Sequence, residues 1–352
     1  MSPKEPAATK TVGHRFDERC DLSRIRFEAL AYAETFQVPG KGVGAYRTPR
    51  SQEPALYASC DVAIMRTIMG EDLRARLTTD QRNEWIAHIN AFALADGNYQ
   101  RYTHHSFEHA NGMVIGALGA LGGRQKHPVR LYEGFDTLEK VVPWLERINW
   151  QEQWSGSHLF WGGMHCFSMS RRCTDEWRHA VLNWLDAELY PKTGWWRRGV
   201  PHAQRLQAFQ PLGGGAHIWP IYQHNNRRFP LPERVIDSIL AMQKPDASWI
   251  LYGNYMELDA LYGLTYMSSL QPDHRRKDIL LAAHRHGQGL IKEWPVFLTG
   301  MPDLHVLLGA VGAFGLLNQL LPDIYYDTVS WTDIFSDRRL YRTAEVDVLD
   351  TP

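Results

Sequence analysis

The chain alternates between two kinds of helical segment that differ in how apolar and polar residues are distributed. Segments of the first kind are amphipathic and carry their charges on one face, which is typical of helices at a protein surface. They cover 22–36, 78–94, 136–147, 174–190, 231–243 and 273–290. Several begin with a helix-start signal, such as Thr78 followed by Asp80 or Thr174 followed by Asp175, and Pro232 stands in an expected first turn.

Segments of the second kind are smoother and richer in small residues. They cover 54–69, 105–121, 157–170, 213–224, 254–269 and 302–319. Apolar residues lie on nearly all sides of these helices, which predicts that they are buried. The two kinds alternate strictly, six of each, at a period of roughly fifty residues, and such a period is typical of a solenoid or a closed array of repeats.

This alternation predicts an all-α fold, an (α/α)6 toroid of six outer and six inner helices. The charged helices would form the outer ring, and the smooth helices would pack side by side around the axis. Small residues would let inner helices approach closely: Gly116, Gly119, Gly312 and Gly315. An open α-solenoid is the alternative, but it would need a longer regular array with capping repeats. The expected organisation is a flexible lead-in at 1–21, one toroid domain at 22–335 and a C-terminal tail at 336–352.

The turns that follow three of the outer helices also repeat. They read Asp96-Gly97-Asn98-Tyr99, Thr193-Gly194-Trp195-Trp196 and Asp246-Ala247-Ser248-Trp249. Gln243 precedes the last turn and gives Gln-x3-Ala-x-Trp, which resembles a degenerate form of the Gln-x3-Gly-x-Trp repeat of squalene and oxidosqualene cyclases. The resemblance covers short turns, and the other copies lack the Gln. It implies kinship of fold with the terpenoid cyclase and protein prenyltransferase superfamily, and it does not imply a shared activity.

Composition and charge exclude several classes of function. The net charge is −1 and the pI is near 7, so the chain has no electrostatic signature of binding to nucleic acid or an anionic membrane. The N-terminus is polar and no window contains 18 apolar residues, so we expect a cytoplasmic protein without a membrane partner. The four cysteines form no CxxC pair, which argues against a disulfide framework or a structural zinc knuckle. The oligomeric state is not predicted.

Polar residues recur in the first turns of every expected inner helix. If all six helices enter from one rim, these residues converge on one funnel, and the 13 Trp and 15 Tyr of the chain could line its wall. The expected catalytic residues are Asp61, His105, His109, His165, His217 and Asp259. The expected substrate-binding residues are Tyr57, His158, Trp161, Trp219, Tyr222, Tyr255, Glu257 and His305.

Histidine is the most prominent of these residue types. A lone histidine on a buried helix is usually a hydrogen-bonded core residue, but His105 and His109 are four residues apart and would share one helix face. A neutral imidazole accepts a proton near pH 7, and a nearby carboxylate can orient it. Asp259 is preferred to Glu257 as the carboxylate that faces the axis, because tight packing continues after it.

The sequence does not predict a metal or another cofactor. Asp61, His109, His165 and His217 could supply zinc ligands, but no HExxH motif and no cysteine pair is present. Protein prenyltransferase β-subunits bind zinc through Asp, Cys and His, and no such ligand motif can be matched here. The chain also lacks the DDxxD and DxDD motifs of class I and class II terpene cyclases, which disfavours those two routes of cyclisation.

Three functions remain open at this point. The favoured one is an acid–base enzyme, a lyase, dehydratase, isomerase or cyclase that acts on a small and partly apolar metabolite. The second is a carbohydrate-active toroid enzyme, namely a glycoside hydrolase, a polysaccharide lyase or a sugar epimerase; a hydrolase would require two carboxylates across the funnel. The third is a binding toroid without catalysis.

Overall fold

The prediction of an all-α chain is confirmed by a computed structural model, which describes residues 19–100, 105–196 and 209–345. The smooth segments form α2 (Leu56–Ile68), α5 (Phe107–Leu121), η2 (Phe160–His165) with α8 (Cys166–Ser168), α10 (Phe209–His224), α12 (Tyr255–Leu270) and α14 (Leu304–Leu320). The charged segments form α1 (Leu22–Glu34), α4 (Thr79–Asn90), α6 (Leu138–Glu146), α9 (Asp175–Ala187), α11 (Pro232–Met242) and α13 (Arg276–Thr299). All twelve expected segments therefore contain helix, although their ends differ by a few residues.

Shorter elements connect these helices. They are α3 (Leu73–Arg76), η1 (Arg130–Gly134), α7 (Gln153–Gly156), η4 (Arg338–Tyr341) and α15 (Arg342–Glu345). Strand β1 (Cys20–Asp21) pairs in parallel with β4 (Tyr325–Tyr326), and β2 (Leu189–Tyr190) pairs antiparallel with β3 (Trp195–Trp196). Within the described ranges, no helix combines the length and the apolar character needed to cross a membrane.

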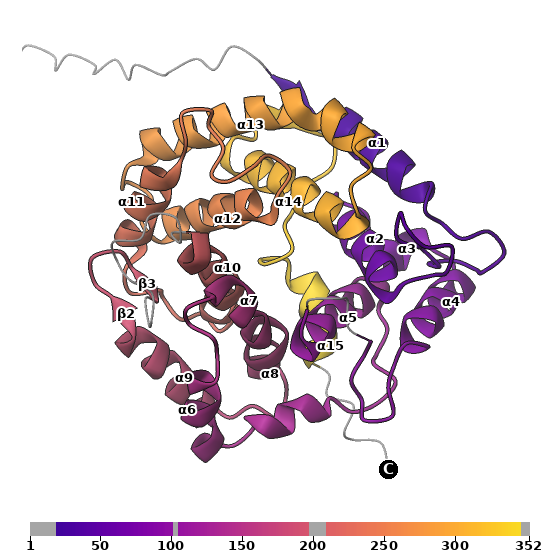
Figure 1. Ribbon diagram of the computed structural model, residues 1–352, viewed down its shortest axis with the longest axis horizontal. Coiled ribbons are helices and arrows are strands. Elements are labelled where there is room, and N and C mark those ends of the chain that lie inside the picture. The colour runs from indigo at the N-terminus through magenta and orange to yellow at the C-terminus, as the bar shows by residue number, and fades with distance from the viewer. Residues whose placement is uncertain (1–18, 101–104, 197–208, 346–352) are drawn as a thin grey trace, which may run out of the picture.

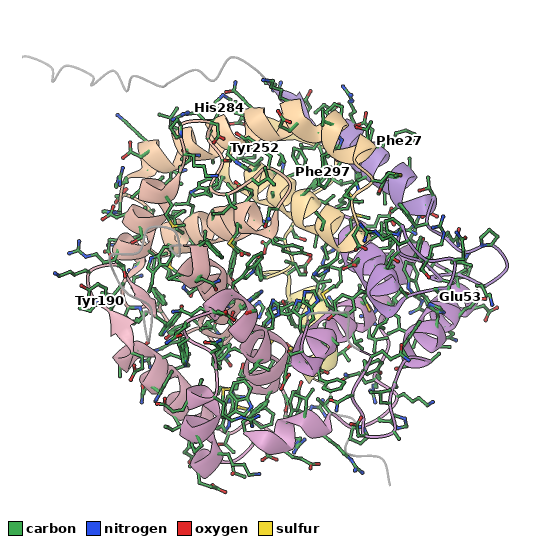
Figure 2. All side chains as sticks on the ribbon, in the orientation of Figure 1. Phe27, Glu53, Tyr190, Tyr252, His284 and Phe297 are labelled. Carbon is green, nitrogen blue, oxygen red and sulfur yellow. The ribbon has the colours of Figure 1, made fainter. Side chains whose placement is uncertain are left out.

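The smooth helices lie at the centre of the molecule and the charged helices lie outside them (Figure 1). Helix α2 packs on α5, α5 on η2, η2 on α10, α10 on α12 and α12 on α14. Helix α14 then packs on α2, so the last central helix meets the first. Side chains fill the spaces between the two layers (Figure 2).

Side-chain caps explain where several outer helices begin. Thr78 caps α4 in a capping box with Gln81, and Thr174 accepts a hydrogen bond from Trp177 N at the start of α9. Pro232 is the first residue of α11, where its missing N–H costs nothing. These are the residues that marked helix starts in the sequence.

The segment expected as one inner helix at 157–170 is not a continuous α-helix. Residues Phe160–His165 form a π-helical turn that continues into the short α8. Gly162 lies so close to α5 that a Cβ atom there would be 1.6 Å from the carbonyl oxygen of Glu108. Asn111 of α5 donates through Nδ2 to the Gly162 carbonyl at 2.7 Å, and Gln125 donates to Asn111 Oδ1. A side chain of the neighbouring helix thus binds a carbonyl of the irregular turn.

The C-terminal segment 331–345 packs among the central helices, although part of it falls within the expected tail at 336–352. Its Tyr341 hydroxyl donates to the Ile334 carbonyl and accepts from Trp161 Nε1 at 3.0 Å. Two of the four glycines expected between inner helices instead face this segment: a Cβ at Gly119 would be 2.4 Å from Leu340 O, and one at Gly315 would be 2.0 Å from Thr332 O. Gly116 and Gly312 face the inner-helix side chains of Ile64 and Leu258, as expected.

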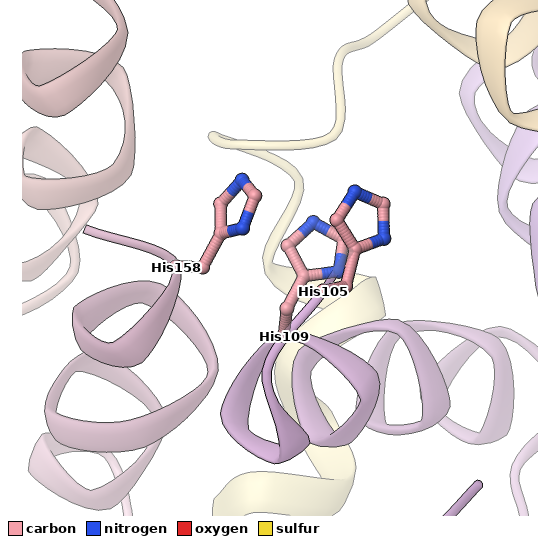
Figure 3. A group of neighbouring side chains, drawn as sticks. All are labelled: His105, His109 and His158. Atoms are coloured by element: carbon pink, nitrogen blue, oxygen red, sulfur yellow. The ribbon is translucent and has the colours of Figure 1, made fainter. Parts of the chain in front are cut away.

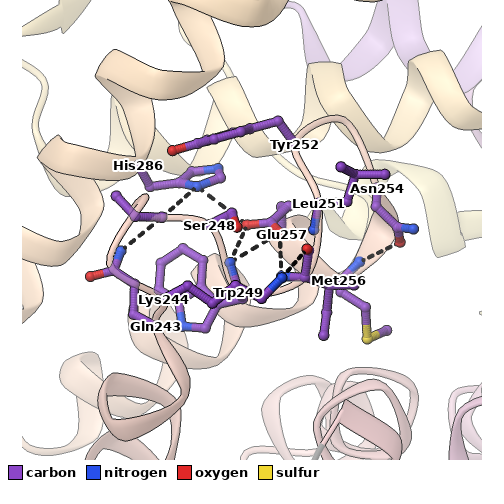
Figure 4. A network of polar contacts seen from close by, with 12 residues as sticks. Gln243, Lys244, Ser248, Trp249, Leu251, Tyr252, Asn254, Met256, Glu257 and His286 are labelled. Carbon is purple, nitrogen blue, oxygen red and sulfur yellow. Dashed lines mark hydrogen bonds and ion pairs between the residues drawn. The ribbon is translucent and has the colours of Figure 1, made fainter. Parts of the chain in front are cut away.

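Tryptophans at the repeated turns bind back to the outer helix that precedes them. The indole Nε1 atoms of Trp196 and Trp249 donate to Leu185 O and Ile239 O, both at 2.9 Å. Gln243 of the cyclase-like motif donates to Ala247 O within its turn and to Ala282 O of α13, which links the outer helices α11 and α13 (Figure 4). The motif therefore fixes a turn between two outer helices.

Candidate functional site

A cavity of about 640 Å³ opens between the central helices. Most of its wall is apolar or aromatic and includes Trp154, Trp161, Phe297 and Phe335, and the volume is in the range of small-molecule sites. The loop before α12 contributes Tyr252, and α13 contributes Phe297 (Figure 2). Of the described residues that line the cavity, none is Asp, Glu, Lys or Arg.

Five histidines from different parts of the central layer share this cavity: His105, His109, His158, His217 and His305. The ring centroids of His105 and His109 are 4.0 Å apart, those of His109 and His158 are 4.5 Å apart, and those of His158 and His217 are 5.0 Å apart. The ring centroid of His305 is 5.2 Å from that of His105. Figure 3 shows His109, in the first turn of α5, and His105, just before this helix, on the same side of His158.

Side chains behind the cavity wall hold three of these rings through Nδ1. The Tyr57 hydroxyl lies 2.9 Å from Nδ1 of His109, and Ser157 Oγ lies 2.7 Å from Nδ1 of His217. The third ring, His305, has Asp61 Oδ1 at 2.9 Å and the Tyr255 hydroxyl at 3.3 Å from its Nδ1. A hydrogen bond at Nδ1 fixes the orientation of the imidazole and leaves Nε2 as the nitrogen that can bind or take a proton.

Helix caps position two of the histidines. Ser106 is the N-cap of α5 and accepts from His109 N at 3.1 Å, and Asp303 is the N-cap of α14 and accepts from His305 N at 2.9 Å. Helix α5 therefore begins at Phe107, and His105 precedes the helix. His105 and His109 both line the cavity, as expected. They do not share a helix face, because His105 reaches the cavity from outside the helix.

Burial disfavours the charged form of three of the cavity imidazoles. Desolvation, followed by repulsion from neighbouring histidines, holds the pKa values of His109 and His158 well below the usual value. Burial lowers the pKa of His217 to about 4. Burial raises the pKa of Asp61 to about 6, although the neighbouring His305 acts in the opposite direction. Burial therefore disfavours the charged forms of His109, His158 and His217 in the cavity wall and of Asp61 behind it.

Nine of the fourteen residues expected in the site belong to this arrangement. Seven line the cavity: His105, His109, His158, Trp161, His217, Tyr255 and His305. Tyr57 and Asp61 contact these rings from behind.

The structure places the other five expected residues elsewhere. His165 does not line the cavity; its Nε2 lies 2.8 Å from Nδ1 of His224, and Tyr341 packs against both rings. Trp219 is buried in the core, and the Tyr222 hydroxyl donates to Asp186 of α9 at 2.8 Å. These three side chains face the packing between helices, because their positions on η2 and α10 point away from the cavity.

Neither carboxylate of α12 faces the cavity, which corrects the choice between Glu257 and Asp259. Glu257 accepts hydrogen bonds from the backbone N–H groups of Trp249, Ile250 and Leu251, and His286 Nδ1 lies 3.2 Å from its Oε2 (Figure 4). It therefore supports the loop that forms one cavity wall. Asp259 is buried, and neither of its carboxylate oxygens has a hydrogen-bond partner within the described ranges.

Several residues in the cavity wall or behind it were not predicted from the sequence. Ser157, which orients His217, stands one residue before the predicted His158 and carries no distinctive signal, because serine is common at helix starts. Tyr252 and Phe297 come from a loop and from the end of an outer helix, where helical periodicity gives no signal. In comparisons with known proteins, no family model matches the chain, and no curated protein sequence and no solved structure matches it.

Proposed function

We propose that the chain is an (α/α)6 toroid enzyme that uses acid–base chemistry on a small, partly apolar metabolite, as a lyase, dehydratase, isomerase or cyclase. The observation that carries the proposal is the convergence of five histidines on one cavity, with Nδ1 of three of them held by Tyr57, Ser157 and Asp61. The closed succession of central helices from α2 to α14 supports the toroid arrangement. Catalytic bases and acids of other enzymes are commonly histidines oriented in this way.

His305 is the best candidate for a general base. When Asp61 accepts the proton of Nδ1–H, Nε2 of His305 carries the lone pair and takes a proton from the substrate. The carboxylate then stabilises the imidazolium that forms. The His305 imidazolium then returns the same proton from Nε2 to the product or the leaving group, so the proton count balances. His217, oriented by Ser157 on the opposite side of the cluster, would accept a hydrogen bond from the substrate at Nε2.

The cavity wall also restricts the substrate class. Aromatic side chains offer apolar surface, and no described lining residue is a Lys or Arg that would pair with a phosphate or diphosphate group. The substrate is therefore an uncharged or weakly charged molecule. Aromatic rings next to uncharged imidazoles would also suit a substrate that passes through a cationic state.

The carbohydrate-hydrolase alternative has weaker support. Hydrolysis of a glycosidic bond requires two carboxyl groups that flank the bond. Asp61 lies behind His305, Glu257 binds a loop backbone, and Asp259 is buried away from the cavity. No pair of carboxylates among the described residues faces the cavity.

Isotope labelling tests the proposal on a mixture of natural metabolites, so the substrate need not be identified first. The full chain, or its H217Q/H305Q variant, is incubated with a cell extract of small molecules in D2O and, separately, in H2(18)O, and products are identified by mass spectrometry. We expect metabolites that gain carbon-bound deuterium with the wild-type chain and not with the variant. Incorporation of 18O without deuterium at carbon would instead indicate hydrolysis. Binding of a metabolite without any change in it would indicate a binding toroid, and either result overturns the proposal.

A further inference from the structure

Three of the cavity histidines have the arrangement of a ligand set. His105, His109 and His158 each offer one ring nitrogen, and these three nitrogens all lie within 4.8 Å of one another. In a tetrahedral site with metal–nitrogen bonds of 2.0–2.1 Å, ligand nitrogens are roughly 3.3 Å apart. Binding of one ion would therefore require these nitrogens to approach one another by up to about 1.5 Å.

The surroundings of these nitrogens favour a cation. No described Lys or Arg lines the cavity, so no positively charged side chain among the described lining residues competes with a cation for these nitrogens. His105 and His158 face each other across His109, with centroids 5.0 Å apart, so the three rings enclose a common space (Figure 3). A positive ion in that space would accept a lone pair from each of the three imidazoles.

A second layer of residues prepares one of the three rings for metal binding. Nδ1 of His109 lies 2.9 Å from the Tyr57 hydroxyl, so Nδ1–H can donate to this oxygen while Nε2 presents its lone pair. Hydrogen bonding of the distal ring nitrogen is the usual feature behind a histidine ligand, because it fixes the tautomer and the ring orientation. The Tyr57 ring also stacks on His105 at 5.3 Å, so one tyrosine contacts two of the three proposed ligands.

We propose that His105, His109 and His158 bind one divalent transition-metal ion, with at least one coordination position open to the cavity. Imidazole ligands select zinc, iron, cobalt, nickel or copper and not magnesium or calcium, which prefer oxygen. Three protein ligands with an open position are typical of catalytic metal sites. This inference deepens the proposed function, because the ion would contact a substrate bound in the same cavity, beside His217 and His305.

Metal titration of the full chain, prepared without a histidine tag and stripped by a chelator, tests the site directly. Zn2+, Co2+, anaerobic Fe2+ and Mg2+ are titrated separately by calorimetry, and bound metal is counted by mass spectrometry. We expect one equivalent of at least one transition ion and no binding of Mg2+. H105Q, H109Q and H158Q should each weaken that binding by about 100-fold or more, whereas H165Q, which changes a buried histidine outside the cavity, should leave it unchanged.

X-ray absorption of the metal-loaded wild-type chain gives a readout that does not depend on any variant folding. A first shell of nitrogen at about 2.0–2.1 Å with imidazole scattering is expected. The proposal is wrong if the wild-type chain binds no stoichiometric transition metal, if the three variants bind it as tightly as the wild-type chain, or if the first shell lacks imidazole. If a product gains deuterium from the solvent and the chain binds no metal, the proposed function stands and the metal site is wrong. Bound metal without any product would confirm the metal site and contradict the proposed function.

Discussion

Oδ1 of Asp61 lies 2.9 Å from Nδ1 of His305, and this contact joins α2, the first central helix, to α14, the last. Asp61 is fully buried, and its other oxygen, Oδ2, has no hydrogen-bond partner within the described ranges. Burial outweighs the attraction of His305 and raises the pKa of Asp61 to about 6, with Asp303 adding to the rise. The fold therefore retains at neutral pH a carboxylate whose ionised form it disfavours, which is a common sign of a functional residue.

We expect D61N to stabilise the chain at neutral pH. The folded-state pKa of about 6 lies above the usual 3.8, so the folded state binds more protons between these values, and ionisation of Asp61 costs stability above pH 6. Asn removes this cost, on the order of 2–3 kcal/mol at pH 8, and the gain should shrink as the pH falls towards 4. Urea unfolding of the wild-type chain and D61N at pH 8, 6 and 4.5 measures it.

Asp333 provides the matched control for this prediction. It is also fully buried, but its carboxylate accepts hydrogen bonds from Phe335 N, Ser336 N, Ser336 Oγ and Gln319 Nε2. D333N places an amide N–H group where donors already point, so it should cost about 1–3 kcal/mol. Equal losses in D61N and D333N would show that Asp61 is an ordinary structural residue.

Replacement of Glu257 should loosen one wall of the cavity. A carboxylate accepts at both oxygens, whereas the Gln side chain of E257Q accepts at one, so some of the N–H groups of 249–251 lose their partner. We expect a loss of about 2–3 kcal/mol and faster hydrogen exchange at these amides. D259N on the same helix is the control, because Asp259 binds no backbone group of the described ranges and the exchange of 249–251 should not change. Unchanged exchange in E257Q would contradict the role given to Glu257.

Much of the helical plan could be predicted because each helix carries its own pattern of apolar residues and caps. The interrupted helix at 160–168 could not, since the π turn depends on Asn111 of another helix binding the Gly162 carbonyl. The packing of 331–345 was missed for a related reason: the segment has no periodicity, and its position is set by contacts of Gly119 and Gly315 far away in the sequence.

The candidate site was predictable where histidines stand at the starts of inner helices. Position in the first turns indicated His109 and His305, and the caps Ser106 and Asp303 hold both of them. Deeper residues on the same helices were less predictable. Residues two apart on α12 point in different directions, and the sequence does not show that Glu257 faces a loop and Asp259 the core.

The buried pair of His165 and His224 should make the chain sensitive to acid. Burial lowers the pKa of His224 to about 4, and the nearby Arg338 acts in the same direction while Asp337 and the Ser336 carbonyl oppose it. The folded-state pKa lies below the usual 6.5, so the unfolded chain binds more protons between pH 6.5 and 4, and stability falls as the pH falls through this window. His224 alone contributes about 2 kcal/mol to the loss between pH 8 and pH 5.

H224Q tests this contribution, because Gln has no charge to gain. Unfolding free energies of the wild-type chain and H224Q at pH 8 and pH 5 should show a smaller decrease for the variant, whatever its stability at pH 8. H274Q is the control, since His274 is partly exposed beside Asp237 and lies outside the core. Parallel pH profiles for the wild-type chain and H224Q would mean that the pair is not kept neutral by burial.

Gly315 should be essential for the part of the cavity wall formed by Ile334 and Phe335, which we call the cavity floor. A Cβ atom at this position of α14 would lie 2.0 Å from the Thr332 carbonyl oxygen. The nearest atoms all belong to the Thr332 backbone, so no flexible side chain could move aside. G315A should therefore displace the segment whose Ile334 and Phe335 side chains form part of the cavity wall. We expect a loss of about 3 kcal/mol or more in the free energy of unfolding, despite the better helix propensity of Ala. G134A is the control, because its nearest atom, Trp144 Cδ1, would be 3.9 Å away. Urea unfolding measures the cost, and hydrogen exchange of 331–335 shows whether the floor has moved. A stable G315A with unchanged exchange would mean that α14 and the C-terminal segment can separate without consequence, and that the cavity floor does not depend on their close approach.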